Sequence, residues 1–128
     1  MPVRLLLVDD DPEIRDVLSE YLDAVGHEVC CASSGREAIV LLANDKEPFD
    51  AALVDWQMAG ISGRDLITHL VERYPATLVF VSTGHDKQVV SDRQLEGVAA
   101  GVFRKPYRLG EMVRAVQAKV DARASTRS

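Results

Sequence analysis

The amino-acid sequence predicts a doubly wound α/β sandwich, in which helices cover both faces of a five-stranded sheet with right-handed crossovers. Short apolar runs alternate with longer stretches whose apolar residues recur at helical spacing. The run from Ala51 to Val54 is apolar throughout and is bounded by Asp50 and Asp55, which is typical of a strand buried on both faces of a parallel sheet. At 128 residues, the chain has the length of one domain with a single core.

Composition and charge narrow the class of protein. Hydrophobic residues make up 47% of the chain and charged residues 27%, as in an ordinary soluble globular protein. A net charge of −5 argues against nonspecific nucleic-acid binding, which depends on Lys and Arg. Cys30 and Cys31 are adjacent in an expected strand, where a bridge between them would be strained, so we expect buried reduced thiols and a cytoplasmic protein. We find neither a signal-peptide pattern nor a membrane-spanning run.

The first half of the chain predicts strand, helix, strand and helix in that order. Val3 to Val8 is a nearly continuous apolar run, and Pro12 suits the first turn of the helix that follows. The apolar face of that helix, which Gly26 ends, is formed by Ile14, Val17, Leu18, Tyr21, Leu22 and Val25. Glu28 to Ala32 is the second strand. Ser34 and Glu37 have the spacing of a capping box at the start of the second helix.

The second half continues the alternation. After the central strand, a helix follows Gly63 and stops at Pro75, and Thr77 to Ser82 is a fourth buried strand. The remaining elements are a weakly patterned helix over Lys87 to Gly97, a short strand around Val102 and Phe103, and a helix with the apolar residues Leu109, Met112, Val113, Val116 and Val120. We expect one domain over residues 1–121 and a flexible, frayed tail over residues 122–128.

Polar residues follow four of the five expected strands. Asp9 and Asp10 come after the first strand, Asp55 after the third, Thr83 after the fourth and Lys105 after the fifth. In open α/β sheets the carboxyl ends of the strands form the edge at which ligands bind. We therefore expect these side chains to converge on one crevice, with Asp55 as the reactive residue.

The chemistry of such a crevice points to a metal ion and a phosphoryl group. Three crowded carboxylates repel one another unless a cation joins them, and oxygen ligands suit a divalent ion such as Mg²⁺. With the ion and Lys105 present, the three carboxylates are neutralised and the site can admit a phosphoryl group. A phosphoryl group on Asp55 would be stabilised by the metal, the Lys105 ammonium and the Thr83 hydroxyl.

Four segments, in order, resemble the receiver domain of response regulators in two-component signalling, and the resemblance covers about Val3 to Ala118. The matching segments are Val8-Asp9-Asp10-Asp11-Pro12, Asp55-Trp56-Gln57-Met58 with Gly63, Thr83-Gly84-His85-Asp86 and Lys105-Pro106-Tyr107. The resemblance implies a flavodoxin-like (βα)5 fold whose parallel sheet has the strand order 2-1-3-4-5.

The resemblance also implies a role for each site residue. Asp55 would accept a phosphoryl group from the phosphohistidine of a sensor kinase, from a phosphotransfer protein or from a small phosphodonor. Asp10, Asp55 and the backbone carbonyl of Gln57 would ligate Mg²⁺, with Asp9 acting through water. Lys105 would pair with Asp55 at rest and with the phosphoryl group afterwards.

Switching and output follow from the same resemblance. Thr83 would move towards the phosphoryl group and change the surface around the fourth helix and fifth strand. Gln57 and His85 would influence the lifetime of the acyl phosphate. The resemblance implies a phosphoacceptor that assists only its own phosphorylation and dephosphorylation rather than an enzyme. The face formed by the fourth helix, fifth strand and fifth helix is a candidate homodimer surface; neither nucleic acid nor membrane is expected as a partner.

Two positions depart from the family pattern. Val102 stands where the family has an aromatic switch residue, three positions before the lysine, and a branched aliphatic side chain cannot swing as a ring does. We hypothesise that Phe103 or the fourth helix substitutes for it. Ala59 replaces a common proline, which loosens the loop after Asp55 without removing a functional group.

Other functions remain open from the sequence alone. A pseudo-receiver scaffold would keep the fold without using phosphate, and retention of all five site residues argues against it. A Mg²⁺-dependent aspartyl phosphatase generally needs an added cap domain or a second acid two residues beyond its nucleophile. Taken singly, Asp9 or Asp10 could be only a helix cap before Pro12. The segment after Ala122 is too short for an effector domain, so the chain is either a stand-alone receiver or part of a larger regulator.

Overall fold

The computed structural model describes residues 2–44, 47–56, 63–83, 99–105 and 108–127. Five parallel strands form one sheet in the order β2-β1-β3-β4-β5, which confirms the predicted flavodoxin-like topology. The strands are β1 (Arg4–Val8), β2 (Glu28–Ala32), β3 (Ala51–Asp55), β4 (Leu78–Thr83) and β5 (Gly101–Arg104).

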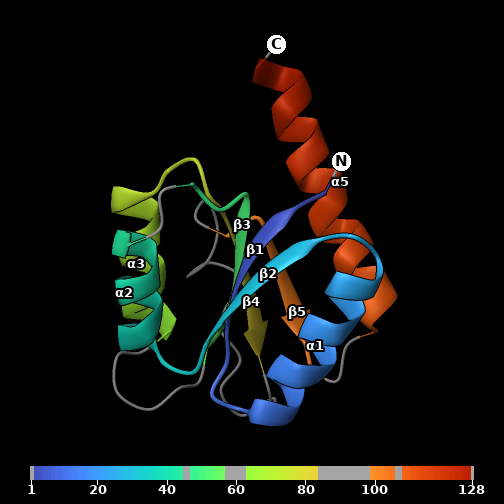
Figure 1. Ribbon diagram of the computed structural model, residues 1–128. Helices are drawn as coiled ribbons and strands as arrows, with labels where there is room; N and C mark the ends of the chain where they lie inside the picture. The colour runs from blue at the N-terminus through green and yellow to red at the C-terminus, as the bar shows by residue number, and fades with distance from the viewer. Residues whose placement is uncertain (1, 45–46, 57–62, 84–98, 106–107, 128) are drawn as a thin grey trace.

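Helices cover both faces of the sheet (Figure 1). Those within the described residues are α1 (Pro12–Ala24), α2 (Gly35–Asn44), α3 (Gly63–Arg73) and α5 (Leu109–Arg127). One core cluster joins the sheet to α2 and α3 through side chains such as Leu42 and Leu66, and a second joins it to α1 and α5 through side chains such as Leu18 and Met112. The helix predicted over Lys87 to Gly97 lies outside the described residues.

Strand β3 occupies the centre of the molecule, and all five of its residues are buried. Ala52 and Val54 belong to the cluster under α2 and α3, whereas Ala51 and Leu53 belong to the cluster under α1 and α5. Successive side chains of a strand point to opposite faces, so both faces of β3 are apolar. This confirms the expectation that the run ending at Asp55 is buried on both faces.

Local capping explains where the first two helices begin. Asp11 is the N-cap of α1, because its side chain accepts a hydrogen bond from the backbone N–H of Glu13 at 2.9 Å. In α2, Ser34 Oγ accepts from the Glu37 N–H at 3.1 Å, and the Glu37 carboxylate accepts from the Ser33 N–H at 3.0 Å. The predicted capping box is therefore present, with its returning bond shifted by one residue.

Some details differ from the sequence predictions. Strand β4 begins at Leu78 rather than Thr77. The Thr77 N–H donates to the Tyr74 carbonyl in the preceding turn, and the Thr77 hydroxyl donates to the Phe49 carbonyl, which lies before β3. Val17 and Val25 are about half exposed, so the buried stripe of α1 is narrower than its apolar pattern. Cys30 and Cys31 are reduced, as predicted, but only partly buried.

The C-terminal helix is longer than its apolar pattern. Helix α5 continues to Arg127 and projects beyond the sheet (Figure 1). The sequence contains no proline or glycine between Glu111 and Arg127 that would end it earlier. That residues 122–128 form a flexible tail in solution remains a prediction. Within the described ranges, no helix combines the length and the hydropathy that a membrane crossing requires.

Candidate functional site

The carboxyl ends of the central strands bring the predicted site residues to one edge of the sheet. Asp9 follows β1, Asp55 is the last residue of β3, and Thr83 is the last residue of β4. The register aligns Val8 with Val54 and Asp55 with Ser82, so these strand ends are level with one another. Lys105 follows β5 and is joined to β4 by a 2.8 Å hydrogen bond from its backbone N–H to the Thr83 carbonyl.

Three carboxylates form the centre of the site. One oxygen each from Asp9, Asp10 and Asp55 lies within 4.8 Å of the other two. Asp9 and Asp55 are 1% and 5% exposed, whereas Asp10 is open to solvent. The ligand atoms are all carboxylate oxygens, which favour a hard divalent cation such as Mg²⁺ over a metal that prefers sulfur or imidazole. This arrangement fits the predicted metal site, although Gln57 lies outside the described residues.

Lys105 reaches both buried carboxylates. Its Nζ lies 2.9 Å from Asp9 Oδ2, to which it donates a hydrogen bond, and 3.4 Å from Asp55 Oδ2. Burial lowers the pKa of Lys105, but the hydrogen bond to Asp9 and the charges of Asp55 and Asp9 outweigh burial and raise the pKa above its ordinary value of 10.5. The lysine is therefore charged at neutral pH. The family resemblance implied a pair with Asp55, and the structure adds a shorter contact with Asp9.

Asp9 is held by four hydrogen bonds. Its N–H donates to the Ala32 carbonyl at 3.1 Å, and its own carbonyl accepts from Arg15 Nη1 at 2.7 Å. Its Oδ1 accepts from the Asp11 N–H at 2.9 Å, and its Oδ2 accepts from Lys105. Arg15 was not predicted from the sequence, since a basic residue in the first turns of a helix looks the same whether it is solvated or bound to backbone.

Two hydroxyl residues end strand β4 beside Asp55. Thr83 is 8% exposed and Ser82 is 1% exposed. Ser82 is the register partner of Asp55, and its carbonyl accepts a 2.9 Å hydrogen bond from the Trp56 N–H. Sequence reasoning identified Thr83 from its place after the fourth strand but missed Ser82, because the proximity of Ser82 to Asp55 depends on the strand register.

The position of Phe103 does not support its proposed role as a substitute switch. Its ring stacks on Phe80, with centroids 5.9 Å apart, in the cluster under α1 and α5. Val81 belongs to the cluster under α2 and α3, and Thr83 lies two residues beyond it on the same strand. Strand alternation therefore places Thr83 on the same face as Val81 and on the face opposite to Phe103. Val102 pairs with Val81 and is 42% exposed. His85, Ala59 and the fourth helix lie outside the described residues.

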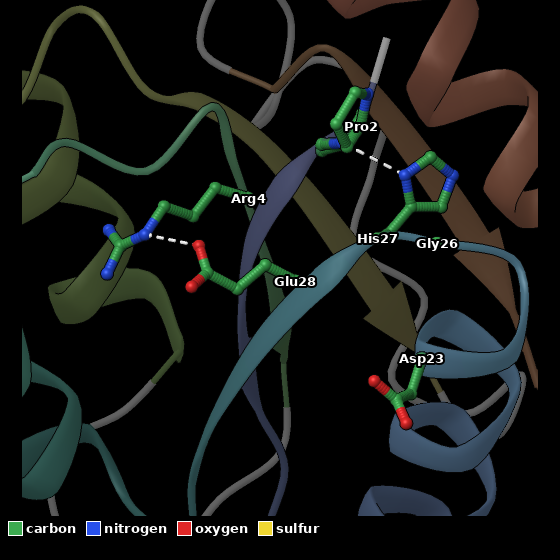
Figure 2. A pocket seen from close by; sticks show the side chains of 7 residues that line it. Pro2, Arg4, Asp23, Gly26, His27 and Glu28 are labelled. Atoms are coloured by element: carbon green, nitrogen blue, oxygen red, sulfur yellow. Dashed lines mark hydrogen bonds and ion pairs between the residues drawn. The ribbon is translucent and has the colours of Figure 1, made fainter.

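A second hollow lies at the opposite edge of the sheet, beside the starts of β1 and β2 (Figure 2). It has a volume of about 410 Å³, and two side-chain contacts are formed between its lining residues. Arg4 pairs with Glu28 at 2.8 Å, and His27 Nδ1 accepts a 2.9 Å hydrogen bond from the Val3 N–H. These contacts tie β1 to β2 and have a structural role.

Comparisons with known proteins agree with this geometry. Residues 5–117 match the model of the response regulator receiver domain. The chain is 35% identical over 121 residues to the response regulator MprA of Mycolicibacterium vanbaalenii, a match covering 92% of this chain and 50% of that protein. Across the first curated relatives, the chain spans between 24% and 50% of their length.

Solved structures show the same fold. A CheY-like response regulator receiver domain protein from Methanospirillum hungatei superposes with a TM-score of 0.88 at 25% identity, covering 98% of this chain and 99% of that one. The response regulator protein TrrA from Thermotoga maritima, in complex with Mg²⁺-BeF, has a TM-score of 0.79 at 28% identity, covering 94% and 99% of the two chains. The chain belongs to the family of response regulator receiver domains.

Proposed function

We propose that this receiver domain accepts a phosphoryl group on Asp55 in a Mg²⁺-dependent reaction and thereby switches a partner or output surface. The observation that carries the proposal is the convergence of Asp9, Asp10 and Asp55 within 4.8 Å, with the Lys105 ammonium between the two buried acids. Such a site concentrates positive charge where a phosphoryl group would arrive, once a divalent cation joins the carboxylates.

Asp55 suits the role of acceptor better than its neighbours. It ends a fully buried strand, so its position is fixed by the core on both faces of the sheet. Asp9 uses one carboxylate oxygen to accept from the Asp11 N–H and the other to accept from Lys105, and both bonds would be disturbed if Asp9 carried an acyl phosphate. Asp10 is exposed, so water would readily reach and hydrolyse an acyl phosphate formed on it.

The donor set fits Mg²⁺, with Asp10 and Asp55 as direct ligands and Asp9 acting through water. When bound, the cation supplies the positive charge that lets a phosphate approach three carboxylates. The similar protein TrrA was solved in complex with Mg²⁺-BeF, which supports the proposal of a divalent cation and a phosphoryl group at this site. The backbone carbonyl of Gln57 is the third proposed protein ligand.

Lys105 and Thr83 are proposed to bind the phosphoryl oxygens. The Lys105 ammonium already lies 3.4 Å from Asp55 Oδ2, so a small movement away from Asp9 would bring it to a phosphoryl oxygen. The Thr83 hydroxyl would donate to another oxygen, and the 2.8 Å bond between the Thr83 carbonyl and the Lys105 N–H would couple the ends of β4 and β5.

The proposed phosphoryl donor is the phosphohistidine of a sensor kinase or phosphotransfer protein in the cytoplasm. In the transfer, the bond between phosphorus and the imidazole nitrogen breaks while a bond to an Asp55 oxygen forms. Hydrolysis later returns the carboxylate and releases phosphate, so the domain acts only on its own phosphoryl group. The chain spans at most half of the length of the first curated relatives, so the output activities of those proteins are not assigned to it.

Intact-mass measurement after incubation with acetyl phosphate tests this function. With Mg²⁺, the wild-type protein should gain the mass of one phosphoryl group, and omitting Mg²⁺ in the presence of EDTA should abolish the gain. The Asp55→Asn variant lacks the acceptor oxygen and should gain no mass. Equal modification of wild type and Asp55→Asn would contradict Asp55 as the acceptor, and no Mg²⁺-dependent gain would favour a pseudo-receiver scaffold.

A further inference from the structure

Arg15 on α1 contacts the acidic site through the backbone rather than through a carboxylate. Its Nη1 donates a 2.7 Å hydrogen bond to the Asp9 carbonyl oxygen in a partly buried position. A guanidinium bound to a peptide carbonyl restrains the chain itself, because the acceptor cannot rotate as a side chain does. The contact therefore acts on the turn from which Asp9 and Asp10 project.

The four hydrogen bonds of Asp9 divide into two kinds. The bonds from the Asp11 N–H and from Lys105 use the carboxylate, and both must adjust if that carboxylate turns towards a cation or a cation-bound water. The bond to the Ala32 carbonyl and the bond from Arg15 use the backbone and can persist. Within the described part of the chain, the Arg15 side chain can thus hold Asp9 both with and without a bound cation.

Precise placement matters for this donor set. Mg²⁺ requires nearly ideal octahedral geometry with short metal–oxygen distances, so small shifts of a carboxylate weaken binding. Asp9 is 1% exposed, and a carbonyl deprived of the Arg15 bond must find another donor in a region with little solvent. Loss of the guanidinium would therefore move the turn.

We propose that Arg15 is a positioning residue for the cation site, which restrains the Asp9–Asp10 backbone so that these carboxylates and Asp55 face one point. The inference rests on the proposed function, since it assigns a role in the same site. It adds a residue of α1 to a site otherwise built from the ends of β1, β3, β4 and β5.

The positive charge of Arg15 and its proposed positioning role predict opposite effects on Mg²⁺ affinity when Arg15 is replaced. Removing a positive charge near a cation site strengthens cation binding by electrostatics alone. Losing a group that orients metal ligands weakens binding, typically by a factor of 10 to 100. We therefore expect Arg15→Met, which keeps an apolar stem of similar length, to raise the Mg²⁺ dissociation constant about tenfold.

Backbone amide NMR spectra recorded during a Mg²⁺ titration test the inference, since they report both folding and the dissociation constant. The matched control is Arg36→Met, which removes the same charge from an exposed position in the first turn of α2. A wild-type-like spectrum with about tenfold weaker Mg²⁺ binding in Arg15→Met, and no such weakening in Arg36→Met, would support the positioning role.

If a folded Arg15→Met variant binds Mg²⁺ as tightly as the wild-type protein or more tightly, the inference is overturned. That result would not contradict the proposed phosphorylation of Asp55. Weakening of equal size in both variants would also overturn it, because the Asp9 contact would not explain the loss. Absence of Mg²⁺ binding by the wild-type protein would contradict the proposed function itself. If Arg15→Met does not fold, Arg15→Gln is titrated under the same criteria.

Discussion

At the scale of single residues, Lys105 links the two buried acids of the site. One ammonium lies 2.9 Å from Asp9 Oδ2 and 3.4 Å from Asp55 Oδ2, and these carboxylate side chains are 2% and 7% exposed. Before a cation binds, Lys105 supplies the positive charge that lies beside both buried side chains at the sheet edge.

Replacing Lys105 with Met should therefore destabilise the cation-free protein. We expect the free energy of unfolding at pH 7 to fall by about 3 kcal/mol, because two buried carboxylates lose their common partner. Added Mg²⁺ should recover part of the loss by binding the folded state. Urea unfolding with and without Mg²⁺ measures both effects, and Lys119→Met, at an exposed position on α5, is the control. Unchanged stability of Lys105→Met would contradict this electrostatic role.

The raised pKa of Lys105 predicts a pH dependence at the alkaline end. A lysine whose pKa is higher in the folded than in the unfolded state contributes stability fully below its ordinary pKa of 10.5 and loses that contribution as pH rises through the folded-state pKa. The stability difference between wild type and Lys105→Met should stay constant up to about pH 10 and shrink above it. Urea unfolding of both proteins along a pH series measures this difference; a decline beginning near neutral pH would be inconsistent with it.

The convergence of site residues could be predicted where the position of a residue follows from its strand. Asp9, Asp55 and Lys105 each follow or end an apolar run, so their convergence could be inferred from parallel topology. Arg15 and Ser82 could not be inferred, since one depends on a side-chain conformation and the other on strand register. Alternation along β4 and β5 places Phe103 and Thr83 on opposite faces, which does not support Phe103 as a substitute for the missing aromatic switch; the alternative, the fourth helix, stays a prediction.

At the scale of elements, the start of α1 connects helix stability to the site. Asp9, Asp10 and Asp11 form a continuous acidic turn in which only Asp11 is the N-cap, while the Asp11 N–H donates to Asp9. The Asp11 carboxylate is thereby used for the helix, and Asp9 and Asp10 remain for the site.

The Asp11→Ala variant should separate these roles. We expect it to lower the free energy of unfolding by about 1 kcal/mol, because the Glu13 N–H loses its capping acceptor. Mg²⁺ affinity should change little, since the Asp11 N–H that supports Asp9 is retained. Urea unfolding and Mg²⁺ titration measure the two quantities, with Asp16→Ala as an exposed control on the same helix. A large loss of Mg²⁺ affinity in Asp11→Ala would instead place Asp11 among the metal-binding groups.

Element order and type were predictable because β1, β3 and β4 are apolar runs and the described helices contribute apolar side chains to the two core clusters. The ends were harder to predict, since they depend on tertiary hydrogen bonds. Thr77 has a strand-like sequence context, yet its bonds to Phe49 and Tyr74 place it in a turn. The length of α5 beyond Val120 reflects the absence of a helix-breaking residue rather than further core burial.

At the scale of the whole molecule, the sheet and its two core clusters are complete before the end of α5. The last core side chains of that helix are Val116 and the partly buried Val120. Beyond them, the Arg123 guanidinium donates a 2.7 Å hydrogen bond to the Pro75 carbonyl in an exposed position. The predicted domain boundary at residue 121 directly follows Val120, the last of these core side chains.

Removing residues 122–128 should therefore leave the fold and the site intact. We expect the free energy of unfolding to fall by less than about 1 kcal/mol, because the loss includes the exposed Arg123 hydrogen bond and the described side chains of this segment do not belong to either core cluster. Arg123→Ala in the full chain is the matched control for that bond. Urea unfolding of the three proteins measures the change, and a loss of several kcal/mol on truncation would show that the domain extends beyond residue 121.

Borohydride reduction followed by peptide sequencing tests the central claim most directly, because it converts an aspartyl phosphate to homoserine and so locates it. After phosphorylation with acetyl phosphate and Mg²⁺, homoserine should be found at position 55 and not at positions 9 or 10. The same treatment without Mg²⁺ should leave all three aspartates unchanged. Homoserine at Asp9 or Asp10, or none despite Mg²⁺ binding, would contradict the account of these acids as a cation site around a single phosphoacceptor.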